Sequence, residues 1–109
     1  MAIFIITGNY TAQAIQGMIA SPSDRAAAVE PLVESVGAKM LNYYATTGEN
    51  DFLMICEGAD GADIIPAMMV AGASGTVSNL KTVRGFSAGE FMAAQQKAGA
   101  IAAGFKPAG

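Results

Sequence analysis

The chain of 109 residues lacks histidine and tryptophan entirely, and it contains one cysteine, Cys56. Without histidine the protein lacks the commonest general base, the commonest zinc ligand and a frequent haem ligand. A haem iron would need tyrosine, methionine or Cys56 as its axial ligand instead. One cysteine excludes a disulfide within the chain, and its position in an apolar segment predicts a small buried side chain. The sequence therefore predicts no metal site and no cofactor.

Charge is also scarce. Only 14% of the residues are charged, the formal net charge is −3, and lysine and arginine form no cluster. Since nucleic-acid binding needs a basic stripe to neutralise phosphates, a nucleic-acid partner is not expected. About 25% of the residues of an ordinary globular domain are charged. With 52% hydrophobic residues, the chain is short of polar surface, which predicts that one face is buried against another copy in a homodimer or higher homo-oligomer.

The sequence has no long hydrophobic run near its start. The apolar stretch from Ala2 to Ile6 follows no charged leader, and it is far shorter than the about 20 residues that cross a bilayer. We therefore expect a cytoplasmic protein with no membrane association.

What the chain does contain is a hairpin signal. Residues Asn42 to Glu57 read as two strand-forming runs joined by the polar turn Gly48-Glu49-Asn50-Asp51. One strand and one helical stretch flank the hairpin on each side. The sequence thus predicts an α+β domain with the order β-α-β-β-α-β, a four-stranded antiparallel sheet and an additional C-terminal helix.

The expected strands cover about residues 2–10, 39–46, 51–58 and 76–86. Thr11 is expected to cap a first helix that runs to about Ala20, and Ser21 or Ser23 a second one, which Pro31 should bend or split. Asp60 and Asp63 are candidate caps for a helix that starts near Ile64, and Ser87-Ala88-Gly89-Glu90 fits a capping box for the last helix. The whole chain, 1–109, is expected to form one domain, with about 99–109 as a C-terminal extension.

Strand periodicity predicts two unlike sheet faces. If Thr46 opposes Asp51, one face of the hairpin is apolar and the other is mixed. The apolar face would hold Leu41, Tyr43, Phe52, Met54 and Cys56, and the mixed face Met40, Asn42, Tyr44, Thr46, Asp51, Leu53, Ile55 and Glu57.

Several short motifs occur in a fixed order between about residues 2 and 91: Gly8-Asn9-Tyr10-Thr11, then Gln13, Ile15, Ser21-Pro22 and Arg25, then Tyr44-x-Thr-x-Gly48-Glu49-x-Asp51, Gly75-x-Val77, Arg84-x-Phe86 and Glu90. In these motifs the chain resembles the GYD domain family. It departs from the family pattern at Asn50, where the family has tyrosine, and at Gln16, where a basic residue is common.

This resemblance implies a dimeric α/β-barrel of ferredoxin-like units, in which two four-stranded sheets associate through their uncovered faces. The family has no established common activity. Other proteins with that barrel include small monooxygenases, haem-degrading enzymes, isomerases and decarboxylases, so the resemblance implies a fold and leaves the activity open.

Four polar residues on the expected strands are candidate ligand-binding residues: Tyr10, Asn42, Tyr44 and Arg84. They suit a small-molecule pocket, where tyrosines donate to a carbonyl or phenolic ligand. They suit equally the polar belt of a subunit interface, where tyrosine and arginine are enriched. A buried Arg84 would seek a carboxylate such as Asp51 or Glu57.

Other polar groups have plainer interpretations. Glu49 and Asp51 can act as an acid-base pair, but turn chemistry explains them as well. Arg25 is expected to be solvated or to pair with Glu49. The amides of Gly8 to Thr11 are a weak candidate for anion binding.

Three functional hypotheses remain open. The first is a homo-oligomeric barrel that binds a small apolar or aromatic ligand. The second is a cofactor-independent monooxygenase or isomerase, with Tyr44 and Asp51 moving protons and Arg84 stabilising negative charge. The third is a purely structural or interaction protein.

Overall fold

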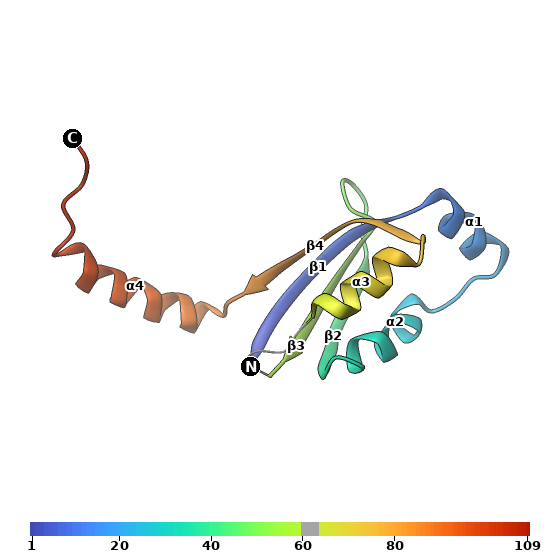
Figure 1. Cartoon of the computed structure of the whole chain (residues 1–109), viewed down its shortest axis with the longest axis horizontal. Helices are drawn as coiled ribbons and strands as arrows, with labels where there is room; N and C mark the ends of the chain where they lie inside the picture. The colour runs from blue at the N-terminus through green and yellow to red at the C-terminus, as the bar shows by residue number, and fades with distance from the viewer. Residues whose placement is uncertain (60–63) are drawn as a thin grey trace.

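The computed structural model describes residues 1–59 and 64–109. Within these residues the elements follow one another in the expected order (Figure 1): β1 (Ala2–Tyr10), α1 (Ala12–Ala20), α2 (Arg25–Glu34), β2 (Ala38–Ala45), β3 (Phe52–Gly58), α3 (Ile65–Ala73), β4 (Val77–Gly85) and α4 (Ala88–Ala102).

The four strands form one antiparallel sheet in the order β2-β3-β1-β4. With helices in both crossovers, this is the ferredoxin-like β-α-β-β-α-β arrangement with an added C-terminal helix, as predicted. The hairpin is also confirmed, since the Thr46 amide donates to the Asp51 carbonyl at 2.9 Å and Gly48 has a φ of 99° that favours glycine.

Helices α2 and α3 cover one face of the sheet (Figure 1). Their side chains pack with alternate residues of β1, β2 and β3, and the resulting core consists of Ile6, Val33, Ala38, Phe52, Met54, Cys56 and Ile64. Cys56 is fully buried as a free thiol, which confirms the role predicted for it.

The expected facing of the hairpin was wrong at two residues. The register between β2 and β3 shifts between Met40 and Asn42, so Met40 pairs with Cys56 and packs against the core. Leu41 lies in this irregularity and is exposed. A bulge inserts an unpaired residue into a strand, so the residues before it point to the opposite face from the one that strict alternation predicts.

Two helix details differ from the expectations. Asp24, rather than Ser21 or Ser23, caps α2, because its carboxylate accepts from the Ala27 amide at 3.1 Å. Pro31 does not split α2: only one amide is lost, and Ser35 still donates to the Pro31 carbonyl. The capping box of Ser87 and Glu90 is confirmed, whereas Asp60 and Asp63 lie outside the described residues.

None of the described helices covers the second face of the sheet, and we call it the open face. By strand register its centre is formed by Ile3 and Ile5 of β1 beside Glu57 and Ile55 of β3, with Leu53 next in line. Its edges are more polar, with Lys39, Asn42 and Tyr44 on β2 and Lys81 on β4. An apolar centre inside a polar rim is the usual anatomy of a protein interface.

Helix α4 projects away from the sheet as an arm (Figure 1). Each of its residues is exposed. The radius of gyration is 17.9 Å, whereas a compact chain of this length has about 13 Å. Among the described residues, no helix has the length and apolar character needed to cross a membrane.

The thiol of Cys56 generates a prediction about alkaline pH. Burial raises the pKa of Cys56 from 9.0 to about 11. Because the folded thiol keeps its proton longer than the unfolded one, its contribution to stability is full below pH 9 and is lost as the pH rises toward 11. We expect the free energy of unfolding to fall by up to roughly 2.5 kcal/mol over that range, measured by urea denaturation.

Cys56→Ala is the control, and its stability should change less over the same pH interval. An equal decline in both proteins would show that other groups cause it. The native thiol should also resist alkylation at pH 8 until the protein is unfolded.

Candidate functional site

A cavity that is partly open to solvent lies at the C-terminal end of β1, between the sheet and helices α2 and α3. Its volume is about 210 Å³. Most of its lining is apolar, and the polar exceptions are Tyr10, Arg25, Tyr43, Ser74 and Thr76. Tyr10 and Arg25 also line two neighbouring hollows beside α1, of about 290 and 410 Å³. Tyr10 and Arg25 therefore lie at the junction between the cavity and the two hollows.

Three aromatic rings form one wall of the cavity. The Phe52 ring lies 5.2 Å from that of Tyr10 and 6.1 Å from that of Tyr43, to which it is nearly parallel. Gly8 makes this packing possible, since a β-carbon there would come within 2.8 Å of Phe52 Cζ. The aromatic wall therefore requires glycine at position 8.

The phenol oxygens of Tyr10 and Tyr43 are hydrogen-bonded to each other. Burial raises the pKa of the Tyr10 phenol above 10.0, while the neighbouring Arg25 guanidinium acts in the opposite direction. Tyr10 therefore keeps its proton at neutral pH. The pair has one O–H that is not used between the two oxygens and that can be donated to a ligand.

Arg25 occupies the first turn of α2, which Asp24 caps. Its Nη1 donates to Ser23 Oγ at 3.4 Å, but its buried Nε has no hydrogen-bond partner. A buried donor without an acceptor costs stability, and in a cavity wall it provides a place for a ligand oxygen. The structure places Arg25 beside Tyr10 and records no ion pair between Arg25 and Glu49 among the described residues.

Asp51 has a structural role at this end of the sheet. Its Oδ2 accepts from the Tyr10 amide at 2.9 Å, and its own amide donates to the Gly8 carbonyl at 2.8 Å. The Thr11 amide in turn donates to the Thr76 carbonyl. Since the Tyr10 and Thr11 amides are both occupied, they are not available to an anion.

Of the four predicted ligand residues, Tyr10 alone lines the cavity. Asn42 and Tyr44 are exposed on the open face, where Asn42 Nδ2 donates to the Tyr44 oxygen at 3.3 Å. Arg84 is exposed at the far end of β4, with its guanidinium 4.6 Å from the centre of the Phe86 ring.

Arg84 is far from the cavity because its register partner, Phe4, lies six residues before Tyr10, about 20 Å along a strand. Within one protomer Tyr44, Asp51 and Arg84 therefore do not share a site. Among the residues that the structure describes, no group of three cysteine or acidic side chains is placed to hold a metal ion.

Arg25 and Tyr43 were not predicted as site residues. Tyr43 was assigned to the apolar face, and the signal overlooked was that a tyrosine on such a face needs a partner for its hydroxyl. Arg25 gave no such signal, because only the packing of α2 brings it beside Tyr10.

Known proteins share both the motifs and the fold of this chain. The family model described as the GYD domain matches residues 4–94. No curated protein matches the chain. The crystal structure of TTHA0845 from Thermus thermophilus has a similar fold, with a TM-score of 0.52 and 15% sequence identity, and the alignment covers 81% of this chain and 96% of that one.

Because the family model spans most of the chain, the protein belongs to the GYD domain family. The resemblance inferred from the short motifs is thereby confirmed. At 15% identity, the likeness to the Thermus protein shows the fold alone.

The structural role of Asp51 can be tested by two substitutions. Asp51→Ala removes the acceptor of the Tyr10 amide, and we expect it to cost about 1–3 kcal/mol. Asp51→Asn keeps a carbonyl oxygen at the same place and should cost less. Urea denaturation measures both, and an Asp51→Ala protein as stable as the wild type would remove Asp51 from this role.

Proposed function

We propose that this GYD domain protein is a homo-oligomer that associates through the open faces of its sheets and binds a small aromatic or apolar ligand. The observation that carries the ligand proposal is the apolar cavity of about 210 Å³, with the Tyr10 and Tyr43 phenols and the unpaired Nε of Arg25 on its wall. An apolar lining with a few convergent polar groups is typical of small-molecule sites.

The size and chemistry of the cavity favour a ligand with one ring. A dry apolar cavity of roughly 150 Å³ accommodates benzene, so a cavity of about 210 Å³ leaves room for a ring and a small polar substituent. The Phe52 ring offers a stacking surface, and the free tyrosine O–H and Arg25 Nε are both donors. A carbonyl, phenolate or carboxylate oxygen on the ring would satisfy them.

The composition of the open face supports the oligomer proposal. Ile3, Ile5, Leu53 and Ile55 lie side by side at its centre, and no described helix covers them. Burying an aliphatic side chain of this size contributes about 1.5–3 kcal/mol. The surrounding Asn42 and Tyr44 would then belong to the polar belt of the interface, which is one of the two roles that the sequence suggested for them.

The enzyme hypothesis receives less support from the geometry. Arg84 lies far along the sheet from Asp51, and the Asp51 carboxylate is engaged by the Tyr10 amide. The purely structural hypothesis predicts a cavity that takes up no ligand, so the binding experiment below separates it from our proposal.

Ligand binding is tested by titrating the protein with benzoate, phenol and toluene while observing the ring resonances of Tyr10, Tyr43 and Phe52 by NMR. We expect saturable shifts with benzoate or phenol at up to millimolar concentration. Arg25→Met should weaken benzoate binding about tenfold, because a hydrogen bond from a charged donor is lost, whereas toluene should be affected less.

Arg84→Met is the matched control, since it removes the same side chain from an exposed position outside the cavity. Its affinity for benzoate should equal that of the wild type. If none of the three probes shifts these rings, the ligand proposal fails and the structural hypothesis takes its place.

The oligomer is tested by Ile55→Lys at the centre of the open face. Light scattering at micromolar concentration should give at least a dimer for the wild type and a lower mass for the variant, because burying a lysine among the isoleucines of this interface would desolvate its charge. Met69→Lys introduces the same charge at an exposed residue of α3 and should leave the mass unchanged. A monomeric wild type would refute the proposal.

A further inference from the structure

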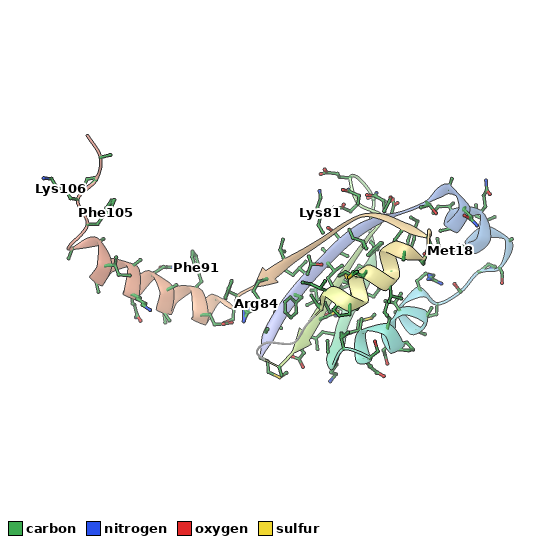
Figure 2. The ribbon with its side chains drawn as sticks, in the orientation of Figure 1. Met18, Lys81, Arg84, Phe91, Phe105 and Lys106 are labelled. Carbon is green, nitrogen blue, oxygen red and sulfur yellow. The ribbon has the colours of Figure 1, made fainter. Side chains whose placement is uncertain are left out.

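Helix α4 carries an apolar seam that nothing described in its own chain covers. Within α4 the seam consists of Phe91, Ala94, Ala98 and Ile101, and Phe105, just beyond the end of the helix, continues the same steps of three and four residues. Phe91, Ile101 and Phe105 are 64%, 62% and 69% exposed. Figure 2 shows Phe91 and Phe105 on the arm, well away from the sheet.

A helix of this length needs a partner. The 15 residues of α4 are at the margin of what folds alone, since isolated helices of about 12–15 residues are barely stable in water. Only two residues separate the end of β4 from α4, and Ser87 is already its capping residue. In the structure this short connection directs the arm away from the sheet (Figure 1).

We propose that α4 pairs antiparallel with α4 of a second copy of this chain. Steps of three and four residues are the spacing with which one helix packs against another. Within the helix, two large seam residues flank two small ones: Phe91, Ala94, Ala98 and Ile101. This order of sizes is the same whether the helix is read from its N-terminus or from its C-terminus. In an antiparallel pair each Phe91 comes beside Ile101 of the second copy, and the alanines meet in the middle, where small side chains let two helices approach closely.

Charge also favours this partner. Glu90 and Lys97 are the charged residues of α4, and Lys106 follows it. An antiparallel pair brings Glu90 to the C-terminal end of the second copy's helix, which Lys106 follows, and opposes the two helix dipoles. A parallel pair would instead bring the two Glu90 side chains together. The seam itself carries no charge for a partner of different composition to recognise.

The area of the seam limits the strength of the pairing. A buried aromatic side chain covers about 150–250 Å², so the seam offers on the order of 400 Å² per copy, half of the roughly 800 Å² per partner in a typical stable interface. The inference therefore rests on the proposed oligomer, which brings the arms together.

The family model ends at residue 94, so most of the seam lies outside the domain that the family shares.

Cross-linking tests the pairing directly. Full-length Ala94→Cys and Ala98→Cys proteins are mixed in urea, refolded together under reducing conditions and then mildly oxidised. We expect a covalent dimer, because the antiparallel seam brings these two positions within the 4.4–6.8 Å between α-carbons that a disulfide typically spans. Ala100→Cys, which lies on the opposite side of the helix, and the wild type with its buried Cys56 are the controls. If the mixture gives no more cross-linked dimer than these controls, the proposal is overturned.

A second measurement compares Ala98→Glu with Ala100→Glu. Both place the same charge on exposed positions of α4, but only the first lies in the seam. We expect amide hydrogen exchange over residues 88–102 to be at least tenfold faster in Ala98→Glu, since an unpaired helix frays. Equal exchange in the two variants would also overturn the pairing. The mass of the Ile55→Lys protein reports separately on association through the open face. A failure of the α4 pairing can therefore be distinguished from a failure of the proposed oligomer.

Discussion

Successive side chains of β1 and β3 point to opposite faces of the sheet, and in this chain both sets are apolar. The described chain has α2 and α3 to cover one face and no helix on the other. The core around Ile6 and Cys56 follows from the covered face, and the open face leaves Ile5 and Ile55 at the centre of an apolar surface. The low content of charged residues is consistent with this, because both faces of the central strands are mostly apolar.

The candidate ligand site depends on the same packing. The covered face ends at Tyr10, where the helices no longer fill the space above the sheet and a cavity remains. Phe52 can enter this wall only because Gly8 has no side chain, and Asp51 holds the neighbouring strand end through the Tyr10 amide. Tyr10 and Tyr43 are thus positioned by contacts between β1 and the β2–β3 hairpin, whereas Arg25 is supplied by α2.

Most of the fold could be predicted, because its signals are local. The Gly48 turn, the capping box at Ser87 and the alternation in β3 each depend on neighbours in the sequence. The wrong or missing predictions have a common cause, since each concerns a residue whose position is set by a contact between distant segments and not by its neighbours in the sequence. The bulge at Met40 reverses an alternation that is otherwise regular, and Arg25 lies beside Tyr10 only because the packing of α2 on the sheet brings its first turn there. The candidate site was therefore recovered at Tyr10 and missed at Arg25 and Tyr43.

The sequence by itself determined the element order, the hairpin, the family and the surplus of apolar surface, since these depend on residue type and spacing. Only the tertiary structure decided which polar residues meet. Tyr10, Tyr43 and Arg25 come from three separate segments, and the distances between them are set by how α2 packs on the sheet. It also decided that α4 stands apart from the domain, because the direction of a helix after a strand depends on the few dihedral angles of the connection, which residue patterns do not encode.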